Sequence, residues 1–509
     1  MAIVEIASGK VEGFEKRGVQ QFRGIPYAAP PIGERRWRPP AAVEPWAGTF
    51  EATEYGPIAP QAPSPFHTAL GAAIPATDEK GCLTLNVWTP NADGAKRPVM
   101  VWLHGGSYVI GDGRTPWYDG VHYARQRDVV VVTCNYRLGA LGYLHLDDVL
   151  GDDFASSGNC GLLDQVAVLE WVRDNIAGFG GDPGNVTIFG ESAGAMSTST
   201  LLGTPAAAGL FHRAITQSGA LAHVYPGPEP ATEVAHDFLT EMEIEPANAR
   251  ALLDAPIDQL IAAQDALVAK QFGGTGEGIG IIFQPGVDGE VLPRHPLDAV
   301  RDGSIAGVPL LAGVTSEEMK LFITFASEFN EMSDEQLATR MSAAVSPGLA
   351  TVVDDYKRHF DPDAQLTRVD LWSRILTDRV FTWPCVELLT AQASNAPGSV
   401  YAYEFAFRST AMGGTFGAAH AVDIPFTFDN LSAPGAQFFV GEPTSEMQSL
   451  ATACADAWTS FARTGRPSAT GLPEWPAWDP RGAATMILDT APKLAADPWA
   501  FARRAWAQT

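Results

Sequence analysis

The segment VTIFGESAGAMS (Val186–Ser197) contains the turn that decides the fold. It passes from β-branched and aromatic residues through Gly-Glu-Ser-Ala-Gly into small helix-forming residues. Glycines two positions before and two positions after a serine permit a very tight turn, because they lack a Cβ. A turn of this kind between a strand and a helix would hold Ser192 in a strained, exposed conformation. The segment therefore predicts either a reactive serine or a serine that serves only the turn.

Apolar runs elsewhere predict an α/β fold with a large, mostly parallel central sheet. RPVMVWLHGG (Arg97–Gly106) and DVVVVTCNY (Asp128–Tyr136) are continuously apolar, which is typical of strands buried on both faces. GLLDQVAVLEWVRDNI (Gly161–Ile176) has apolar residues at helical spacing. Further strands are expected at Ala2–Phe14 and Val19–Ala28 (as hairpins), Cys82–Pro90, His212–Gly219, Val308–Glu317, Ser399–Phe407 and 485–489, with a helix at 446–463.

No charge block, low-complexity linker or internal repeat divides the 509 residues. We expect a single domain over residues 1–509, in which strands alternate with helices that cover both faces of the sheet. The segments at about 220–305 and 320–395 are predicted to be helical insertions over the sheet edge where the strands end.

The net charge of −25 excludes some classes of partner. Nucleic acid and anionic membranes are not expected, since binding either one requires clustered Lys and Arg. The chain starts without the basic and apolar pattern of a signal peptide, and no apolar run approaches the ~18–20 residues of a membrane span. The five cysteines are odd in number and lack a Cys-x-x-Cys pair, so neither a disulfide framework nor a zinc site is predicted. These features favour a cytoplasmic location.

A serine hydroxyl needs a base to accept its proton and an acid to hold that base. After a nucleophilic turn of this type the expected order along the chain is serine, acid, histidine. His420, in the glycine-rich stretch GGTFGAAHAVDIPFTF, is the candidate base. Glu317 and Glu318 follow a predicted buried strand in AGVTSEEMKLF, and either one can be the acid while the other starts a helix.

Backbone N–H donors are needed to stabilise an oxyanion. WLHGGSY (Trp102–Tyr108) provides a strand end followed by two glycines, whose backbone can approach a substrate closely. The N–H of Ala193, directly after Ser192, is the other expected donor. The alternative is that His-Gly-Gly forms only a turn.

Taken together, these motifs resemble the type-B carboxylesterases, which include p-nitrobenzyl esterase-like bacterial enzymes and the cholinesterases. The resemblance extends over nearly the whole chain. It is carried by FRGIPYAAPPIGERRWRPP, LTLNVWTP, VMVWLHGGSY, CNYRLGALGY, GNCGLLDQVAVLEWVRDNIAGFGGDPGNVTIFGESAG, QSGA, GVTSEEMKLF, HAVDIPF, AWTSFARTGRPS and PEWPAWDP. It implies an α/β-hydrolase fold.

The resemblance also assigns roles to residues. Ser192 matches the nucleophile, Glu318 the acid of the triad and His420 its base, so that Glu317 takes the place of the aspartate in the family's usual Asp-Glu-Gly. The expected oxyanion-hole donors are Gly106, Ser107 and Ala193, with Gly105 shaping the turn. Ser218 and Glu191 match residues that support the triad.

Some positions depart from the family pattern. Lys80-Gly81-Cys82 stands where relatives often have Glu-Asp-Cys, which implies that an acidic structural partner is missing and that Cys82 is unpaired. Met319 replaces the usual glycine after the acid. No tryptophan lies between Trp46 and Trp88, where cholinesterases place the ring that holds a quaternary ammonium, so cholinesterase activity is disfavoured.

The resemblance predicts a serine carboxylic-ester hydrolase that acts on a small-molecule ester, with small aryl or short-chain alkyl groups, and requires no metal or organic cofactor. Two alternatives stay open: the same machinery used on amides or carbamates or for acyl transfer, and a non-catalytic cholinesterase-like binding module. Five aromatic residues could line an apolar cavity or belong to the core: Phe283, Phe322, Phe325, Phe329 and Trp372. The physiological ester and the oligomeric state do not follow from the sequence.

Overall fold

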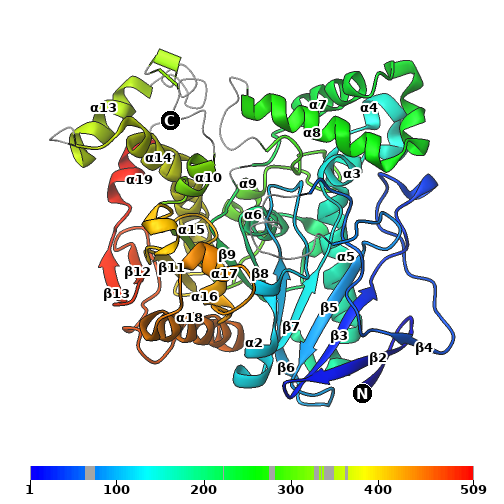
Figure 1. The fold of residues 1–509 in the computed structure, drawn as a ribbon, viewed down its shortest axis with the longest axis horizontal. Coiled ribbons are helices and arrows are strands. Elements are labelled where there is room, and N and C mark those ends of the chain that lie inside the picture. The colour runs from blue at the N-terminus through cyan, green and yellow to red at the C-terminus, as the bar shows by residue number, and fades with distance from the viewer. Residues whose placement is uncertain are drawn as a thin grey trace.

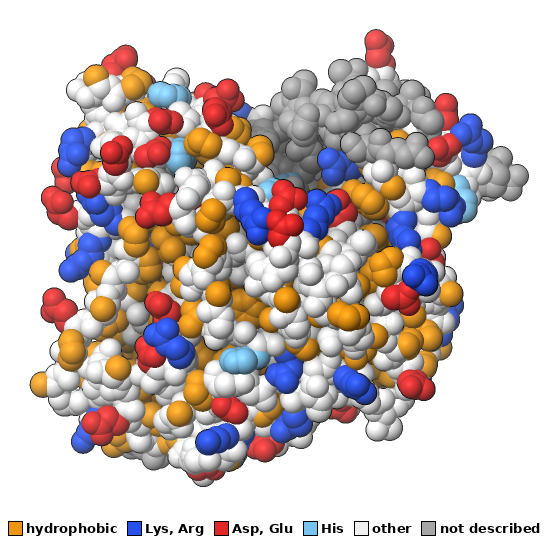
Figure 2. Space-filling model, turned by 180° about the vertical axis from the view of Figure 1, so that it is seen from behind, with side chains coloured by type: hydrophobic (Ala, Val, Ile, Leu, Met, Phe, Trp, Pro, Cys, Tyr) orange, Lys and Arg blue, Asp and Glu red, His pale blue; other side chains and the backbone are white. Residues whose placement is uncertain are grey.

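The computed structural model describes residues 2–63, 75–221, 223–273, 281–325, 332–333, 335–336, 349–361 and 365–507. Within these ranges, no helix combines the length and the apolar character that crossing a membrane requires. On the face drawn in Figure 2, Lys and Arg side chains stand singly or beside Asp and Glu side chains.

A sheet of thirteen strands runs through the described part of the chain (Figure 1). Its order is β1-β2-β3-β5-β7-β6-β8-β9-β10-β11-β12-β13, with β4 beside β2. The run from β7 through β6 to β12 is parallel, while β1, β2, β3 and β5 at one end and β13 at the other pair antiparallel. The strands are β1 (Ala2–Ile6), β2 (Gly9–Lys16), β3 (Val19–Pro26), β4 (Thr49–Glu51), β5 (Thr84–Thr89), β6 (Arg97–Leu103), β7 (Val130–Cys134), β8 (Gly181–Glu191), β9 (Arg213–Gln217), β10 (Leu310–Thr315), β11 (Val400–Phe405), β12 (Ala484–Leu488) and β13 (Lys493–Ala496).

The continuously apolar strands are buried on both faces, because alternate side chains point to opposite sides of the sheet. On β6, Val99 and Val101 pack into one hydrophobic cluster, and Met100 and Trp102 pack into a second cluster. The first cluster includes side chains of α5 (Cys160–Asn175), α6 (Ala193–Leu201) and α15 (Trp383–Asn395). The second includes side chains of α2 (Val121–Arg127), α16 (Ile424–Thr427) and α18 (Ser445–Thr464).

The remaining helices gather mainly beyond the ends of the parallel strands (Figure 1). Residues 220–305 contain α7 (Pro228–Glu241), the 3-10 segment η7 (Pro246–Asp254), α8 (Ile257–Gly273) and α9 (Pro296–Arg301). Residues 320–395 contain α10 (Lys320–Phe325), α13 (Leu349–Phe360), α14 (Arg368–Thr377), the π-helical turn Asp378–Thr382 and α15. The other helices are α3 (Gly139–Tyr143), α4 (Asp147–Leu150), α17 (Ala436–Val440) and α19 (Ala500–Trp506), and the short 3-10 segments are Gly33–Arg35, Pro116–Tyr118, Asp152–Phe154, Ser157–Asn159, Ile176–Phe179, Pro205–Ala207 and Ala411–Gly414.

The predicted α/β-hydrolase fold with its large central sheet is confirmed, and each strand expected from the apolar runs is present. The pattern did not reveal β4 or β13, which are short and at most partly buried, so they carry little apolar signal. The sheet is also more mixed than expected, because antiparallel strands extend both ends of the parallel run.

The expectation of a missing acidic structural partner near Cys82 is wrong. Glu79, three positions before Cys82, forms a two-bond ion pair with Arg36, with both N–O distances 2.8 Å and both side chains buried. The same guanidinium donates to the carbonyls of Leu252 and Ala255, and so fastens η7 to the body of the fold. The carboxylate lies one position earlier than the family's Glu-Asp-Cys spacing would put it. Cys82 is free and buried, as predicted.

The strand order brings the predicted site residues together at one edge of the sheet. Because parallel strands end at the same edge of a sheet, the residues that follow β6, β8, β9 and β10 converge there. Gly105, Ser192, Ser218 and Glu318 each follow one of these strands within three residues.

Candidate active site

Ser192 occupies a sharp turn between β8 and α6. Its φ of 57° and ψ of −127° lie in a region that a non-glycine residue rarely adopts. The turn is held by the Ser192 N–H, which donates to the carbonyl of Gln217 at the end of β9 (3.0 Å). The predicted strand, turn and helix are thus all present. Ser192 is not exposed as expected but buried, on the wall of a cavity.

The glycines of the GESAG motif are required by close packing. A Cβ on Gly194 would lie 2.0 Å from the carbonyl oxygen of Leu103 at the end of β6. A Cβ on Gly190 would lie 2.5 Å from the backbone of Gly194. Both distances are far below van der Waals contact, so larger residues would force the turn away from β6.

The loop after β6 approaches the serine just as closely. A Cβ on Gly105 would lie 2.9 Å from the Ser192 Cβ and 2.7 Å from the Glu191 carbonyl oxygen. Gly106 and Ser107 both have positive φ, of 118° and 53°. Within the described part of the chain, the N–H groups of Gly106, Ser107 and Ala193 donate no hydrogen bond, and Gly106 and Ser107 line the cavity beside Ser192. Free N–H groups of this kind are the donors that an oxyanion requires.

Glu318 contacts His420 directly. Its Oε2 lies 2.7 Å from Nδ1 of His420, and its Oε1 accepts a hydrogen bond of 2.7 Å from the Thr315 N–H. The Glu318 carboxylate is fully buried, and the imidazole is 4% exposed. The rings of Phe322 and Phe381 flank the imidazole at centroid distances of 5.1 and 5.0 Å. The imidazole is therefore fixed by one hydrogen bond and by packing.

Glu317 lies in a different environment from its neighbour. Its carboxylate pairs with Lys320 (2.6 Å) and Arg408, and it accepts a hydrogen bond from the Ala418 N–H (2.9 Å). These contacts lower the pKa of Glu317 despite burial, which by itself would raise it. Met319 has no positive φ, so replacing the usual glycine does not strain the backbone.

The second ring nitrogen of His420 faces Glu191. The Nε2–Oε1 distance is 3.1 Å, and neither atom has a hydrogen-bond partner among the residues that the structure describes. Burial raises the pKa of Glu191 to about 8. Burial lowers the pKa of His420, but the carboxylates of Glu191 and Glu318 outweigh this effect and raise it to about 9. The two side chains therefore compete for a proton: an ionised Glu191 retains it on the imidazole, and a protonated Glu191 permits the imidazole to release it.

Asp423 is a third buried carboxylate near His420, and sequence reasoning missed it. Burial raises its pKa to about 6. Its Oδ2 accepts a hydrogen bond from the Gln217 side chain (2.9 Å), and the Gln217 oxygen in turn accepts from the Trp458 indole N–H (3.0 Å). The sequence feature that could have revealed Asp423 is its position three residues after His420, with apolar residues on both sides.

The structure brings Ser218 to the same edge of the sheet but does not connect it to His420. Ser218 is fully buried at the end of β9 with a φ of 53°. Within the described ranges, its Oγ has no hydrogen-bond partner. A supporting role for Ser218 therefore stays a prediction.

Ser192 and His420 both line a cavity of about 140 Å³. Its walls combine the glycine loop with apolar side chains, contributed by Ile110, Trp117, Tyr118, Leu321, Phe322 and Ile424. Of the five aromatic candidates, Phe322 lines this cavity, whereas Phe283 and Trp372 belong to the hydrophobic core. The side chain of Phe325 and the whole of Phe329 lie outside the described residues.

The comparisons with known proteins agree on one family. The carboxylesterase family model matches residues 1–501. The chain is 38% identical to para-nitrobenzyl esterase of Bacillus subtilis over 97% of this chain and 96% of that protein. It is 33% identical to phenmedipham hydrolase of Pseudarthrobacter oxydans over 96% and 94% of the two chains. The crystal structure of a Geobacillus stearothermophilus carboxylesterase at pH 6.2 superposes with a TM-score of 0.89 at 40% identity, covering 99% of this chain and all of the other.

The contact between Glu191 and His420 predicts how the imidazole titrates. Glu191→Gln removes the carboxylate charge that favours the imidazolium, so the pKa of His420 should fall from about 9 by on the order of one pH unit. The titration can be followed by NMR of protein carrying ¹³C-labelled histidine, with His420→Gln used to assign the signal.

Asp423→Asn provides the matched control, since it also neutralises a buried carboxylate near the same ring. Asp423 contributes less than Glu191 to the raised pKa of His420, so its removal should lower that pKa less. An equal or larger effect of Asp423→Asn would contradict the assignment of Glu191 as the main partner.

Proposed function

The chain belongs to the carboxylesterase family and is a carboxylic-ester hydrolase, and from this premise we propose that Ser192, His420 and Glu318 form its catalytic triad. The substrates are esters with small aryl or short-chain alkyl groups. The observation that carries the proposal is that Ser192, in a strained turn, lines the same cavity as the His420 imidazole. The Nδ1 of this imidazole lies 2.7 Å from the buried Glu318 carboxylate.

His420 acts as the general base. Its Nδ1 contacts Glu318, which leaves Nε2 as the nitrogen that accepts the Ser192 proton. The buried Glu318 carboxylate fixes the tautomer and stabilises the imidazolium that forms during attack. In the free protein Nε2 faces Glu191. An imidazole can accept the serine proton only when it is neutral, so a proton that Glu191 holds on the ring must leave first.

The reaction proceeds through an acyl-enzyme. The Ser192 Oγ attacks the ester carbonyl, and the resulting oxyanion is bound by the N–H groups of Gly106, Ser107 and Ala193. His420 then donates its proton to the leaving alcohol as the C–O bond breaks. Water attacks the acyl-enzyme with His420 again acting as base, which releases the acid and restores the serine.

The size of the cavity supports the substrate class. A space of about 140 Å³ beside Ser192 holds a small group, and its apolar walls favour a hydrocarbon or an aryl ring over a charged one. Para-nitrobenzyl esterase, whose name refers to esters of a benzyl alcohol that carries an aryl ring, is among the relatives, which agrees with an aryl group in this space.

Replacing the nucleophile tests the triad. Ser192→Ala should lower kcat for p-nitrophenyl acetate by roughly 10⁴–10⁶-fold, because no other group can form the acyl-enzyme. A reactive organophosphate should modify the native protein once, at Ser192, as seen by mass spectrometry of its peptides. Near-normal hydrolysis by the variant would rule the assignment out.

The adjacent glutamates provide a second test. Glu318→Gln should lower kcat by about 10³–10⁴-fold, because an amide cannot stabilise the imidazolium. Glu317→Gln should change kcat little, since this carboxylate pairs with Lys320 and Arg408 instead. Circular dichroism of both variants checks that they fold. If Glu317→Gln were the more damaging change, the acid of the triad would have to be reassigned.

The acyl preference can be measured with p-nitrophenyl acetate, butyrate and octanoate. The small cavity predicts that kcat/KM is highest for acetate or butyrate and falls for octanoate. Ile424→Ala removes side-chain volume from the apolar wall and so enlarges the cavity, which should shift the preference toward octanoate. A native preference for octanoate would contradict the short-chain class, and faster cleavage of matched anilides than of esters would favour amide hydrolysis.

A further inference from the structure

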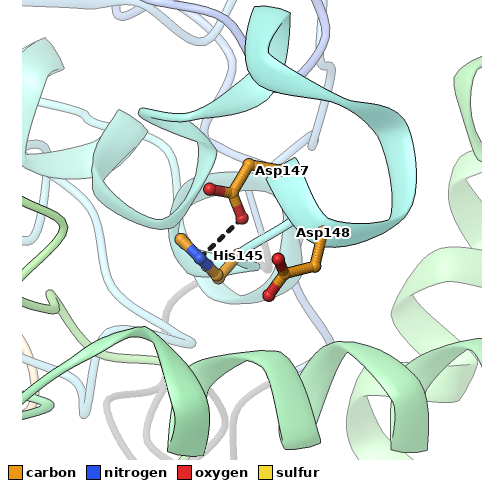
Figure 3. Close-up of side chains that lie close together, drawn as sticks. All are labelled: His145, Asp147 and Asp148. Carbon is orange, nitrogen blue, oxygen red and sulfur yellow. Dashed lines mark ion pairs between the residues drawn. The ribbon is translucent and has the colours of Figure 1, made fainter.

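A cluster of one imidazole and two carboxylates lies outside the cavity that contains Ser192. His145 follows α3, and Asp147 and Asp148 form the first turn of α4 (Figure 3). One ligand atom from each residue lies within 4.8 Å of the other two. The three side chains converge in Figure 3, with the imidazole pointing toward the Asp147 carboxylate. None of them lines the cavity beside Ser192.

Two buried atoms of this cluster face each other as an ion pair, and neither has a hydrogen-bond partner in the part of the chain that the structure describes. The His145 side chain is 95% buried, and its Nε2 makes no hydrogen bond although it lies 2.7 Å from Oδ1 of Asp147. The same Asp147 oxygen also lacks a hydrogen bond. Unsatisfied buried polar atoms are costly. A cation beside this pair, bound to both the nitrogen and the oxygen, would satisfy both atoms.

From this arrangement we propose that His145, Asp147 and Asp148 bind one divalent transition-metal ion of the Zn²⁺ class. Imidazole nitrogen is a ligand that Zn²⁺ accepts readily and Mg²⁺ and Ca²⁺ rarely use, and carboxylate oxygens complete the donor set. Water fills the remaining position. Figure 3 shows the three donors on one short stretch of backbone, so binding requires no rearrangement of the fold.

Binding requires the carboxylate of Asp148 to move toward the other two donors. Neighbouring ligands of a tetrahedral Zn²⁺ with bonds of about 2.1 Å lie about 3.4 Å apart. The three ligand atoms lie within 4.8 Å of one another, and Asp148 is the exposed member whose side chain can rotate to shorten its separation from the others.

The ion would act as a structural link between α4 and the insertion at 220–305. Asp148 Oδ2 accepts a hydrogen bond of 2.6 Å from the Thr232 hydroxyl of α7, and α4 also packs against η7. An ion on Asp148 would fix the carboxylate that holds α7. Because it binds away from Ser192, it would stabilise the fold without taking part in ester hydrolysis.

Metal titration of untagged protein tests the proposal. Protein treated with EDTA and then desalted is titrated with ZnCl₂ by calorimetry, and its Tm is measured with and without Zn²⁺. The native protein should bind one equivalent of Zn²⁺, and its Tm should rise, since a ligand that binds only the folded state stabilises it. Asp147→Asn and Asp148→Asn should each weaken binding by roughly tenfold or more.

Asp152→Asn is the matched control, because it removes an exposed carboxylate from the next short helix and leaves the three donors intact. It should bind Zn²⁺ as the native protein does. Co²⁺ in place of Zn²⁺ should give a visible absorption band that Asp148→Asn loses. No saturable binding, or equal binding by native protein and Asp147→Asn, would overturn the proposal and leave His145 and Asp147 as a plain ion pair. Hydrolysis of p-nitrophenyl acetate should survive EDTA, so this result is independent of the triad assignment.

Discussion

The close approach of the β6 end to the turn after β8 is the constraint on which the site depends. The backbone of Gly194 lies so near the Leu103 carbonyl that no side chain fits between them. The same approach sets Gly105 against Ser192. The serine hydroxyl and the glycine loop are therefore positioned by one packing contact between neighbouring strand ends. This contact explains why a tight turn with unfavourable dihedral angles persists: the sheet on one side and α6 on the other leave it no alternative.

Three carboxylates surround one imidazole at the base of this turn. Glu318 contacts Nδ1 and Glu191 faces Nε2, while Asp423 accepts a hydrogen bond from the Gln217 side chain. Burial lowers the pKa of His420, but the combined field of the carboxylates favours the imidazolium and raises that pKa. Burial raises the pKa of Glu191, and a protonated Glu191 carries no charge that would favour the imidazolium.

Local patterns predicted the parts of the molecule that depend on local chemistry. Continuous apolar runs identified β6 and β7, and the glycine spacing identified the turn at Ser192. Glu317 and Glu318 could not be distinguished by local pattern, because the contacts that separate them involve Arg408 and His420, which come from a distant part of the chain. The family resemblance favoured Glu318 as the acid. Asp423 was missed because its burial is set by α18 and β9. The acidic partner near Cys82 was expected to be missing because the pairing of Glu79 with Arg36 depends on position in space and not on a fixed offset from Cys82.

The rings that flank His420 come from the long excursion between β10 and β11. Phe322 belongs to α10, and Phe381 to the π-helical turn before α15. Phe322 also lines the cavity. A change in the sequence or length of this excursion would therefore alter the wall of the cavity and the surroundings of the His420 imidazole together.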